Sequence, residues 1–185
     1  MSELLSGFIG AVIATLLSVL YFFISEQKKL RSDVMLEVVG YCDDIYRRLQ
    51  DLHVHKGTVY TQNSEFLTPE EYRVVSRELI SLLTSARTRA KLALVHGEGS
   101  TLAAFNGLQA QFQKASSIVR GATRSAWHQE NASLHRLFAE EIDPRRAKFE
   151  RLLLEKTRAF AIVMGFFKQC ILAPYNLAKK LRRQS

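Results

Sequence analysis

Cysteine, proline and glycine are all scarce in this sequence of 185 residues. The two cysteines, Cys42 and Cys170, are too few for a disulfide framework, and each lies on the apolar side of a helical pattern. We therefore expect buried thiols in a reducing compartment. Three prolines and nine glycines, without a low-complexity tract or fixed-period repeat, give little support to strands or long linkers. These absences predict an all-α fold.

Catalytic and ligand-binding motifs are also missing. The sequence has no Glu-x-x-His pair, Gly-rich phosphate loop or nucleophile elbow, so we assign no catalytic, cofactor-binding or metal-binding residues and expect no enzyme. His53 and His55 are two apart and point to different faces of a helix. His128 and His135 share a face but have no acidic or cysteine partner at ligand spacing. The acids before Asp143-Pro144 are interpreted as a helix end followed by a helix cap.

Charge is absent from residues 4–25, a run of 22 positions. A helix that rises about 1.5 Å per residue needs roughly 20 apolar residues to cross about 30 Å of hydrocarbon, so residues 1–25 are predicted to be a transmembrane anchor. A cleaved signal peptide is the alternative, but it requires a cationic start and small residues before the cut. Here the start is acidic, and Tyr21, Phe22 and Phe23 near the end are typical of an interfacial belt.

Three cations, Lys28, Lys29 and Arg31, follow the apolar run, whereas the charged side chain before it is the acidic Glu3. The positive-inside rule therefore predicts a single pass through the inner (plasma) membrane, with the N-terminus outside and the C-terminal domain in the cytoplasm. We expect the three cations to contact the lipid headgroups of an anionic inner leaflet.

One face of the apolar run consists of small residues. They recur at spacing four in two adjacent rows, which comprise Ser6, Gly7, Gly10, Ala11, Ala14, Thr15 and Ser18. In lipid, helices associate where small side chains let their backbones approach closely, so this face predicts a homo-oligomer. The alternative is a simple tether, because small residues are common in spanning helices and short matches to this pattern arise by chance.

The rest of the chain is predicted to form an antiparallel cytoplasmic four-helix bundle over residues 26–173, because its four helical segments have similar lengths. These segments cover about 26–54, Thr68 to about Val95, Ser100 to near Trp127, and Asp143 to Pro174. Thr68 and Asp143 each precede a proline, which is typical of a capped helix start, and Ser100 is the expected cap of the third helix. The first helix continues the membrane helix if the polar residues 25–33 are helical.

Apolar residues spaced three and four apart define the expected core. The first helix contributes Met35, Val38, Cys42, Ile45, Leu49 and Leu52. The third contributes Phe105, Leu108, Phe112, Ala115, Val119, Ala122 and Ala126. A further apolar stretch, residues 159–167, is only nine residues long before Lys168, and a second span would bury that lysine in the bilayer. We interpret this stretch as the most buried part of the bundle or as an interface for another copy.

The formal charge of +8 predicts anionic partners. Residues 174–185 form a basic tail, whose cations are Lys179, Lys180, Arg182 and Arg183. If the fourth helix returns to the membrane, each cation contributes about 1 kcal/mol at an anionic surface, so we expect the four to contact lipid headgroups. A solubilising basic C-terminus is the alternative.

These features together predict a membrane-anchored interaction or scaffolding protein that self-associates through its transmembrane helix and presents the bundle to a cytoplasmic protein partner. One alternative is a membrane-disrupting or pore-forming effector gated by the bundle, although the span has no polar stripe wide enough to line a channel. Another is a membrane-tethered nucleic-acid binder, suggested by Arg87, Arg89, Lys91, Arg145, Arg146, Lys148 and Arg151. Cations alternate with acids along these helices, which favours solvated faces instead.

Overall fold

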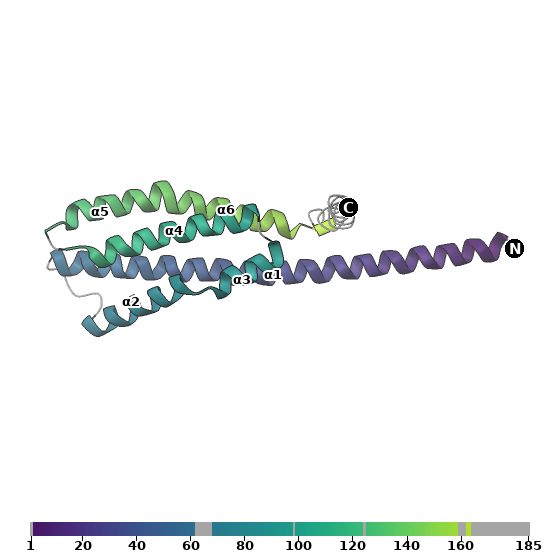
Figure 1. Cartoon of the computed structure of the whole chain (residues 1–185), viewed down its shortest axis with the longest axis horizontal. Coiled ribbons are helices and arrows are strands. Elements are labelled where there is room, and N and C mark those ends of the chain that lie inside the picture. The colour runs from purple at the N-terminus through teal and green to yellow at the C-terminus, as the bar shows by residue number, and fades with distance from the viewer. Residues whose placement is uncertain (1, 62–67, 98, 124, 159–161, 164–185) are drawn as a thin grey trace, which may run out of the picture. The chain divides into compact units, whose positions relative to one another are not determined.

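The computed structural model describes residues 2–61, 68–97, 99–123, 125–158, 162 and 163, and every regular element among them is a helix (Figure 1). The elements are α1 (Ser2–Thr61), α2 (Pro69–Thr84), α3 (Arg87–His96), α4 (Ser100–Gly121), α5 (Trp127–Arg136), the π-helix η1 (Leu137–Ile142) and α6 (Asp143–Thr157). The predicted all-α fold is therefore confirmed for the described residues.

The chain divides into two compact units. The first unit comprises Met1–Asp33 together with Leu154–Ser185, and the second comprises Val34–Leu153. The second unit lies inside the range predicted for the cytoplasmic domain, 26–173. The predicted basic tail, 174–185, and most of the apolar stretch 159–167 lie outside the described residues. Cys170 lies outside them as well.

Helix α1 is longer than the sequence pattern suggested. The first helix of the body was expected over about 26–54, but the backbone is helical from Ser2 to Thr61, including residues 25–33. Gly40 does not interrupt it: a Cβ built there would meet nothing within 4 Å, so the glycine costs only the backbone entropy of an exposed helical position.

One hydrophobic core lies within residues 34–153, and the predicted stripes supply much of it. Val38, Cys42, Ile45, Leu49 and Leu52 of α1 are buried, and so are Phe105, Leu108, Phe112, Ala115 and Val119 of α4. The phenyl rings of Phe105 on α4 and Phe149 on α6 lie 5.6 Å apart, centroid to centroid. Burial raises the pKa of the Cys42 thiol to about 12, so this cysteine stays protonated near neutral pH.

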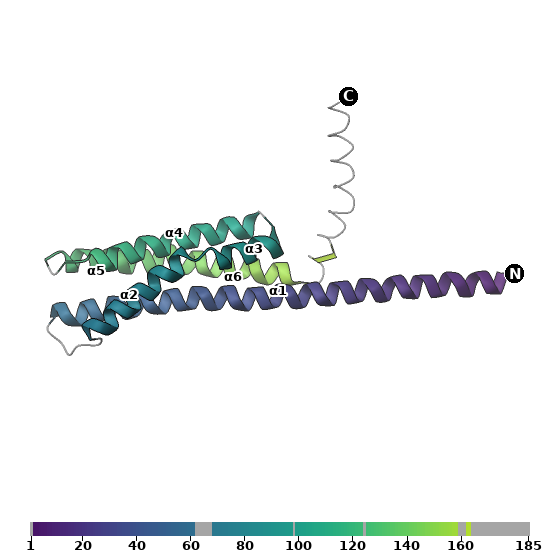
Figure 2. The same cartoon turned by 60° about the horizontal axis from the view of Figure 1, so that its bottom comes forward.

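Neighbouring helical stretches of this unit run in opposite directions (Figures 1 and 2). From α1 to the α5–α6 stretch, contacts pair His53 with Asn131, Tyr46 with Phe138 and Asp43 with Arg146. From α1 to the α2–α3 stretch, they pair Arg48 with Glu78, Tyr41 with Leu82 and Glu37 with Lys91. In both sets the residue number falls along α1 as it rises along the other stretch, so the paired stretches are antiparallel.

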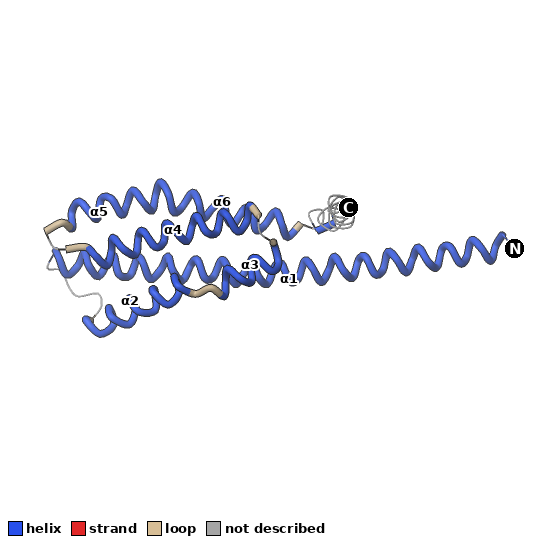
Figure 3. The backbone as a smooth tube through the Cα atoms, viewed as in Figure 1, coloured by secondary structure: helices blue, strands red, loops and turns tan. Residues whose placement is uncertain are grey.

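The prediction of one helix from Thr68 to Val95 is wrong, because Ser85 and Ala86 separate α2 from α3 (Figure 3). Ser85 has extended backbone angles, φ −65° and ψ 119°. The carbonyls released at the end of α2 find side-chain donors: the Tyr41 hydroxyl donates to Leu82 at 2.6 Å and the Gln109 amide donates to Leu83 at 3.1 Å. These tertiary hydrogen bonds satisfy the carbonyl groups at the end of α2.

Two helix caps differ in how well they were predicted. Thr68 is confirmed as a cap: its hydroxyl accepts from the Glu71 N–H at 3.3 Å, and the Glu71 carboxylate accepts from the Thr68 N–H at 2.7 Å. Ser100, however, is not the cap of α4. The N-cap is Gly99, which supplies no side chain, and Ser100 is the first helical residue.

The α-helical segment α6 begins at Asp143 as predicted, but Asp143 does not cap a separate helix, because α5, η1 and α6 form one helical run from Trp127 to Thr157. Helix α4 ends at Gly121, so Trp127 opens this run rather than closing the third helix. Pro144 has no N–H, and its ring would clash with the carbonyl four residues back in a regular α-helix. The wider π-helical turn over Leu137–Ile142 precedes it and accommodates the proline.

Candidate functional site

Helix α1 is long and apolar enough to cross a membrane, and none of its apolar window is buried. The exposed apolar side chains of this window include Phe8, Ile9, Val12, Ile13, Leu16, Leu17 and Val19. An apolar surface of this extent is rare on soluble monomers.

The small residues of α1 form a face without projecting side chains. Added Cβ atoms at Gly7 and Gly10 would meet nothing within 4 Å, and Ala11 and Ala14 are exposed beside them. The side chain of Ser6 lies outside the part that the structure describes.

The hydroxyl groups on this face are already hydrogen-bonded within the helix. Thr15 Oγ1 donates to the Ala11 carbonyl at 2.8 Å, and Ser18 Oγ donates to the Ala14 carbonyl at 2.9 Å. Hydroxyls bonded in this way carry no unmet donor into lipid. The face therefore combines close access to the backbone with satisfied polar groups, as small-residue packing between membrane helices requires.

The cations that follow the apolar part of α1 are not equivalent. Lys28 and Lys29 are exposed, whereas Arg31 is partly buried and its Nη1 donates to the Lys156 carbonyl at 2.9 Å. Lys156 lies in the last turn of α6, so the guanidinium satisfies a terminal helix carbonyl, and burial lowers the pKa of Arg31. Lys179, Lys180, Arg182 and Arg183 lie outside the described residues.

Two histidines that are far apart in the sequence meet at the contact of α1 with α5. His53 is half-buried, its ring lies 5.1 Å from that of His135 and 5.4 Å from that of Trp127, and its Nε2 lies 2.5 Å from Asn131 Oδ1. His55 points elsewhere, with its ring 4.9 Å from that of Tyr72 on α2.

Sequence spacing placed His53 and His55 on different faces, and the structure confirms this. Sequence spacing did not connect His53 with His135. Within the described residues, no group of three or more His, Cys, Asp or Glu side chains is arranged to hold a metal ion.

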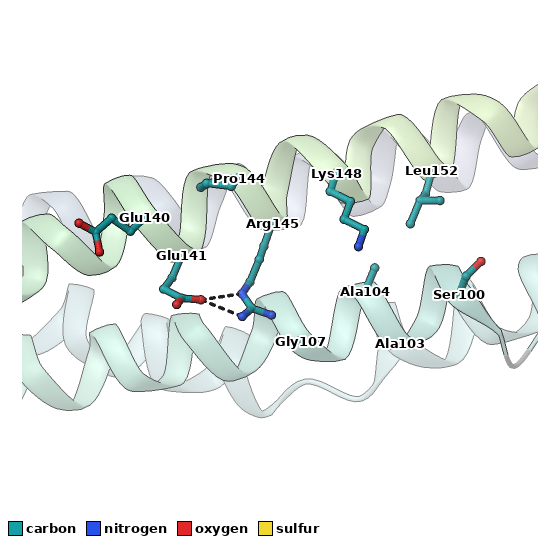
Figure 4. Close-up of a pocket in the computed structure, with 10 residues that line it drawn as sticks. All are labelled: Ser100, Ala103, Ala104, Gly107, Glu140, Glu141, Pro144, Arg145, Lys148 and Leu152. Atoms are coloured by element: carbon teal, nitrogen blue, oxygen red, sulfur yellow. Dashed lines mark hydrogen bonds and ion pairs between the residues drawn. The ribbon is translucent and has the colours of Figure 1, made fainter.

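A groove of about 700 Å³ lies between α4 and the η1–α6 segment (Figure 4). Its α4 side consists of small residues, Ala103, Ala104 and Gly107, and the Lys148 side chain extends toward Ala104 from the other side. Glu141, interpreted from the sequence as part of a helix end, instead lies within the helical run and accepts two hydrogen bonds from Arg145, at 3.0 and 2.8 Å.

Three of the seven cations considered for nucleic-acid binding are engaged in ion pairs. Lys91 pairs with Glu37 at 2.5 Å, and Arg145 pairs with Glu141 at 2.8 Å. Arg146 pairs with Asp43 at 2.5 Å and with Glu150 at 2.9 Å. Arg87, Arg89, Lys148 and Arg151 are exposed. The pairing reduces the cationic surface that these residues offer to phosphates.

The chain matches no protein-family model, and no curated protein or solved structure is significantly similar to it.

Proposed function

We propose that the chain is a single-pass membrane-anchored interaction protein that self-associates through its N-terminal span and presents an antiparallel four-helix bundle to a cytoplasmic protein partner. The observation that carries the proposal is the exposed apolar part of α1, with a small-residue face whose Thr15 and Ser18 hydroxyls are bonded to the helix itself. The opposite directions of neighbouring helical stretches support the bundle.

The same hydroxyl groups argue against a pore. An aqueous channel needs polar groups that are available to water or ions along its lining. Thr15 and Ser18 each donate their hydroxyl proton to a carbonyl of their own helix, and the remaining described members of the face are Gly and Ala. The face is suited to contact with another helix more than to solvation.

The distribution of charge supports attachment of the chain end to an anionic leaflet. Residues 34–153 contain 16 Lys and Arg against 14 Asp and Glu, whereas residues 154–185 contain seven cations and one acid. The hydrogen bond from Arg31 to the Lys156 carbonyl brings the start of this basic segment next to the residues that follow the span. We therefore propose that Lys179, Lys180, Arg182 and Arg183 bind anionic headgroups, with Lys28 and Lys29 beside them.

Reporter fusions should show the C-terminus in the cytoplasm. A fluorescent protein that matures only in the cytoplasm should be active at the C-terminus, and an exported phosphatase that requires oxidation should be inactive there. The same phosphatase should be active when fused before Met1, because the orientation depends on the cations after the span. Phosphatase activity at the C-terminus would overturn the proposed orientation.

Residues 26–185 should sediment with vesicles that contain phosphatidylserine but not with neutral vesicles. Replacing the four tail cations, Lys179, Lys180, Arg182 and Arg183, by Glu should weaken this binding by about 100-fold or more, because each cation contributes about 1 kcal/mol near the surface. The matched control replaces four exposed arginines of the bundle by Glu, namely Arg73, Arg77, Arg87 and Arg89. Equal losses in both variants would show that total charge, not the tail, determines binding.

A further inference from the structure

Four side chains fasten the last part of α1 to α5: His53, Trp127, Asn131 and His135. We call this group the histidine clasp. The ring of Trp127 is buried and lies against α1 at Gly57, where an added Cβ would make an ordinary contact of 3.5 Å with a Trp127 ring carbon. All four members belong to the compact unit 34–153.

The hydrogen bond of the clasp determines where His53 can accept a proton. Asn131 Oδ1 is an acceptor, so the 2.5 Å contact requires the proton on Nε2 of His53. The neutral ring then has its free lone pair on Nδ1. A second proton on His53 creates an imidazolium in a half-buried site, with the His135 ring 5.1 Å away.

We propose that the histidine clasp is a proton-operated switch, which holds α1 against α5 while His53 is neutral and releases Trp127 when His53 is protonated. The exposed His135 ring lies 5.1 Å from that of His53, and its field opposes a positive charge on His53. The conformational change starts at the contact of α1 with α5 and leaves the Phe105, Phe112 and Phe149 core in place.

The charged and titratable groups around the clasp come from three helices. On α5, the field of His135 opposes protonation of His53, and Glu130 has a buried carboxylate oxygen without a hydrogen-bond partner among the described residues. On α1, the Lys56 ammonium donates to the Ala122 carbonyl at 3.0 Å. On α2, Tyr72 packs against His55 rather than His53.

The direction of the pH dependence follows from the same contacts. Burial lowers the pKa of His53, the hydrogen bond to Asn131 partly offsets this, and His135 lowers the pKa further. Because the folded-state pKa lies below the unfolded value of 6.5, the unfolded chain binds more protons in mild acid. The contribution of His53 to stability is therefore fully present above about pH 6.5 and is lost as the pH falls below it.

Trp127 reports on the clasp directly, because it is the single tryptophan of the chain. In the full-length protein in detergent, acrylamide should quench Trp127 fluorescence at least twofold more strongly at pH 5 than at pH 8, with a midpoint below 6.5. His53→Gln should abolish the change, since glutamine keeps a donor for Asn131 but does not titrate. His135→Gln should move the midpoint to lower pH, because an imidazolium at residue 53 is less unfavourable in the closed clasp without the field of His135.

The control is His128→Gln, which removes an exposed imidazole next to Trp127 in the sequence and should leave the midpoint unchanged. Far-UV circular dichroism of every variant at pH 8 verifies that the helices are intact. An unchanged quenching constant between pH 8 and pH 5 would overturn the proposal. So would a His53→Gln profile that follows the unaltered protein.

Discussion

The Gly10→Leu chain is expected to be a monomer in mild detergent under conditions in which the unaltered chain is an oligomer. A Cβ at Gly10 meets nothing within the protomer, so leucine is accommodated by the isolated helix and its effect is confined to contacts made with another helix. Leucine at the centre of the small-residue face separates the two backbones and removes the close packing. We expect the association constant to fall at least tenfold, which corresponds to about 1.4 kcal/mol.

The measurement is the native mass of the full-length protein by light scattering in detergent. Val12→Phe is the matched control: Val12 is exposed and lies two residues away on the other side of the helix, so the added bulk there should not change the mass. If Gly10→Leu retains the oligomer, the small-residue face does not assemble the protein, and α1 acts as a tether. Collapse of the membrane potential on expression of the unaltered chain would favour the pore-forming effector over the scaffold.

The buried face of the body was predictable where the apolar spacing was regular. Val38, Cys42 and Ile45 on α1 recur three or four positions apart, as do Phe105, Leu108 and Phe112 on α4. This spacing directs them to one side of a helix whatever its neighbours are. The cap at Thr68 was predictable for a similar reason, because its hydrogen bonds connect residues three positions apart.

The breaks between helices were less predictable, because their causes are tertiary. The gap at Ser85 depends on donors from Tyr41 and Gln109, which belong to other helices. At Asp143-Pro144 the local signal was present but misinterpreted. An Asp-Pro pair is typical of a helix start, but it is also compatible with the interior of a helix when a π-helical turn relieves the clash of the proline ring.

In the candidate sites, too, local sequence patterns were predictable and tertiary contacts were not. The exposed apolar part of α1 and its small residues are a local pattern, which the sequence spacing alone reveals. His53 and His135 are 82 positions apart, and only the packing of α1 on α5 brings their rings to 5.1 Å. Arg31 was expected to contact lipid because it follows the span, but its guanidinium reaches the carbonyl of Lys156, which no local pattern predicts.

Leu108→Ala should destabilise the unit 34–153 far more than the same substitution at Leu94. Leu108 on α4 is completely buried in the hydrophobic core, whereas Leu94 on α3 is 87% exposed. Removing a buried leucine side chain leaves a cavity and costs about 2–5 kcal/mol. An exposed leucine loses little burial, and alanine has the higher helix propensity, so Leu94→Ala should change the free energy of unfolding by less than about 0.5 kcal/mol.

Guanidinium titration of the full-length protein at pH 8, followed by Trp127 fluorescence, measures both variants with one probe, because Trp127 is buried and belongs to the same unit. At this pH the histidine clasp is closed, so the signal reports unfolding of the unit rather than release of the clasp. A loss of about 2–5 kcal/mol is a large fraction of the 5–15 kcal/mol typical of a folded domain, so the Leu108→Ala transition should move to clearly lower denaturant. Similar midpoints for the two variants would mean that α4 does not pack its Leu108 face into a shared core, and the four helical stretches would then not form the cooperative bundle on which the proposed scaffold depends.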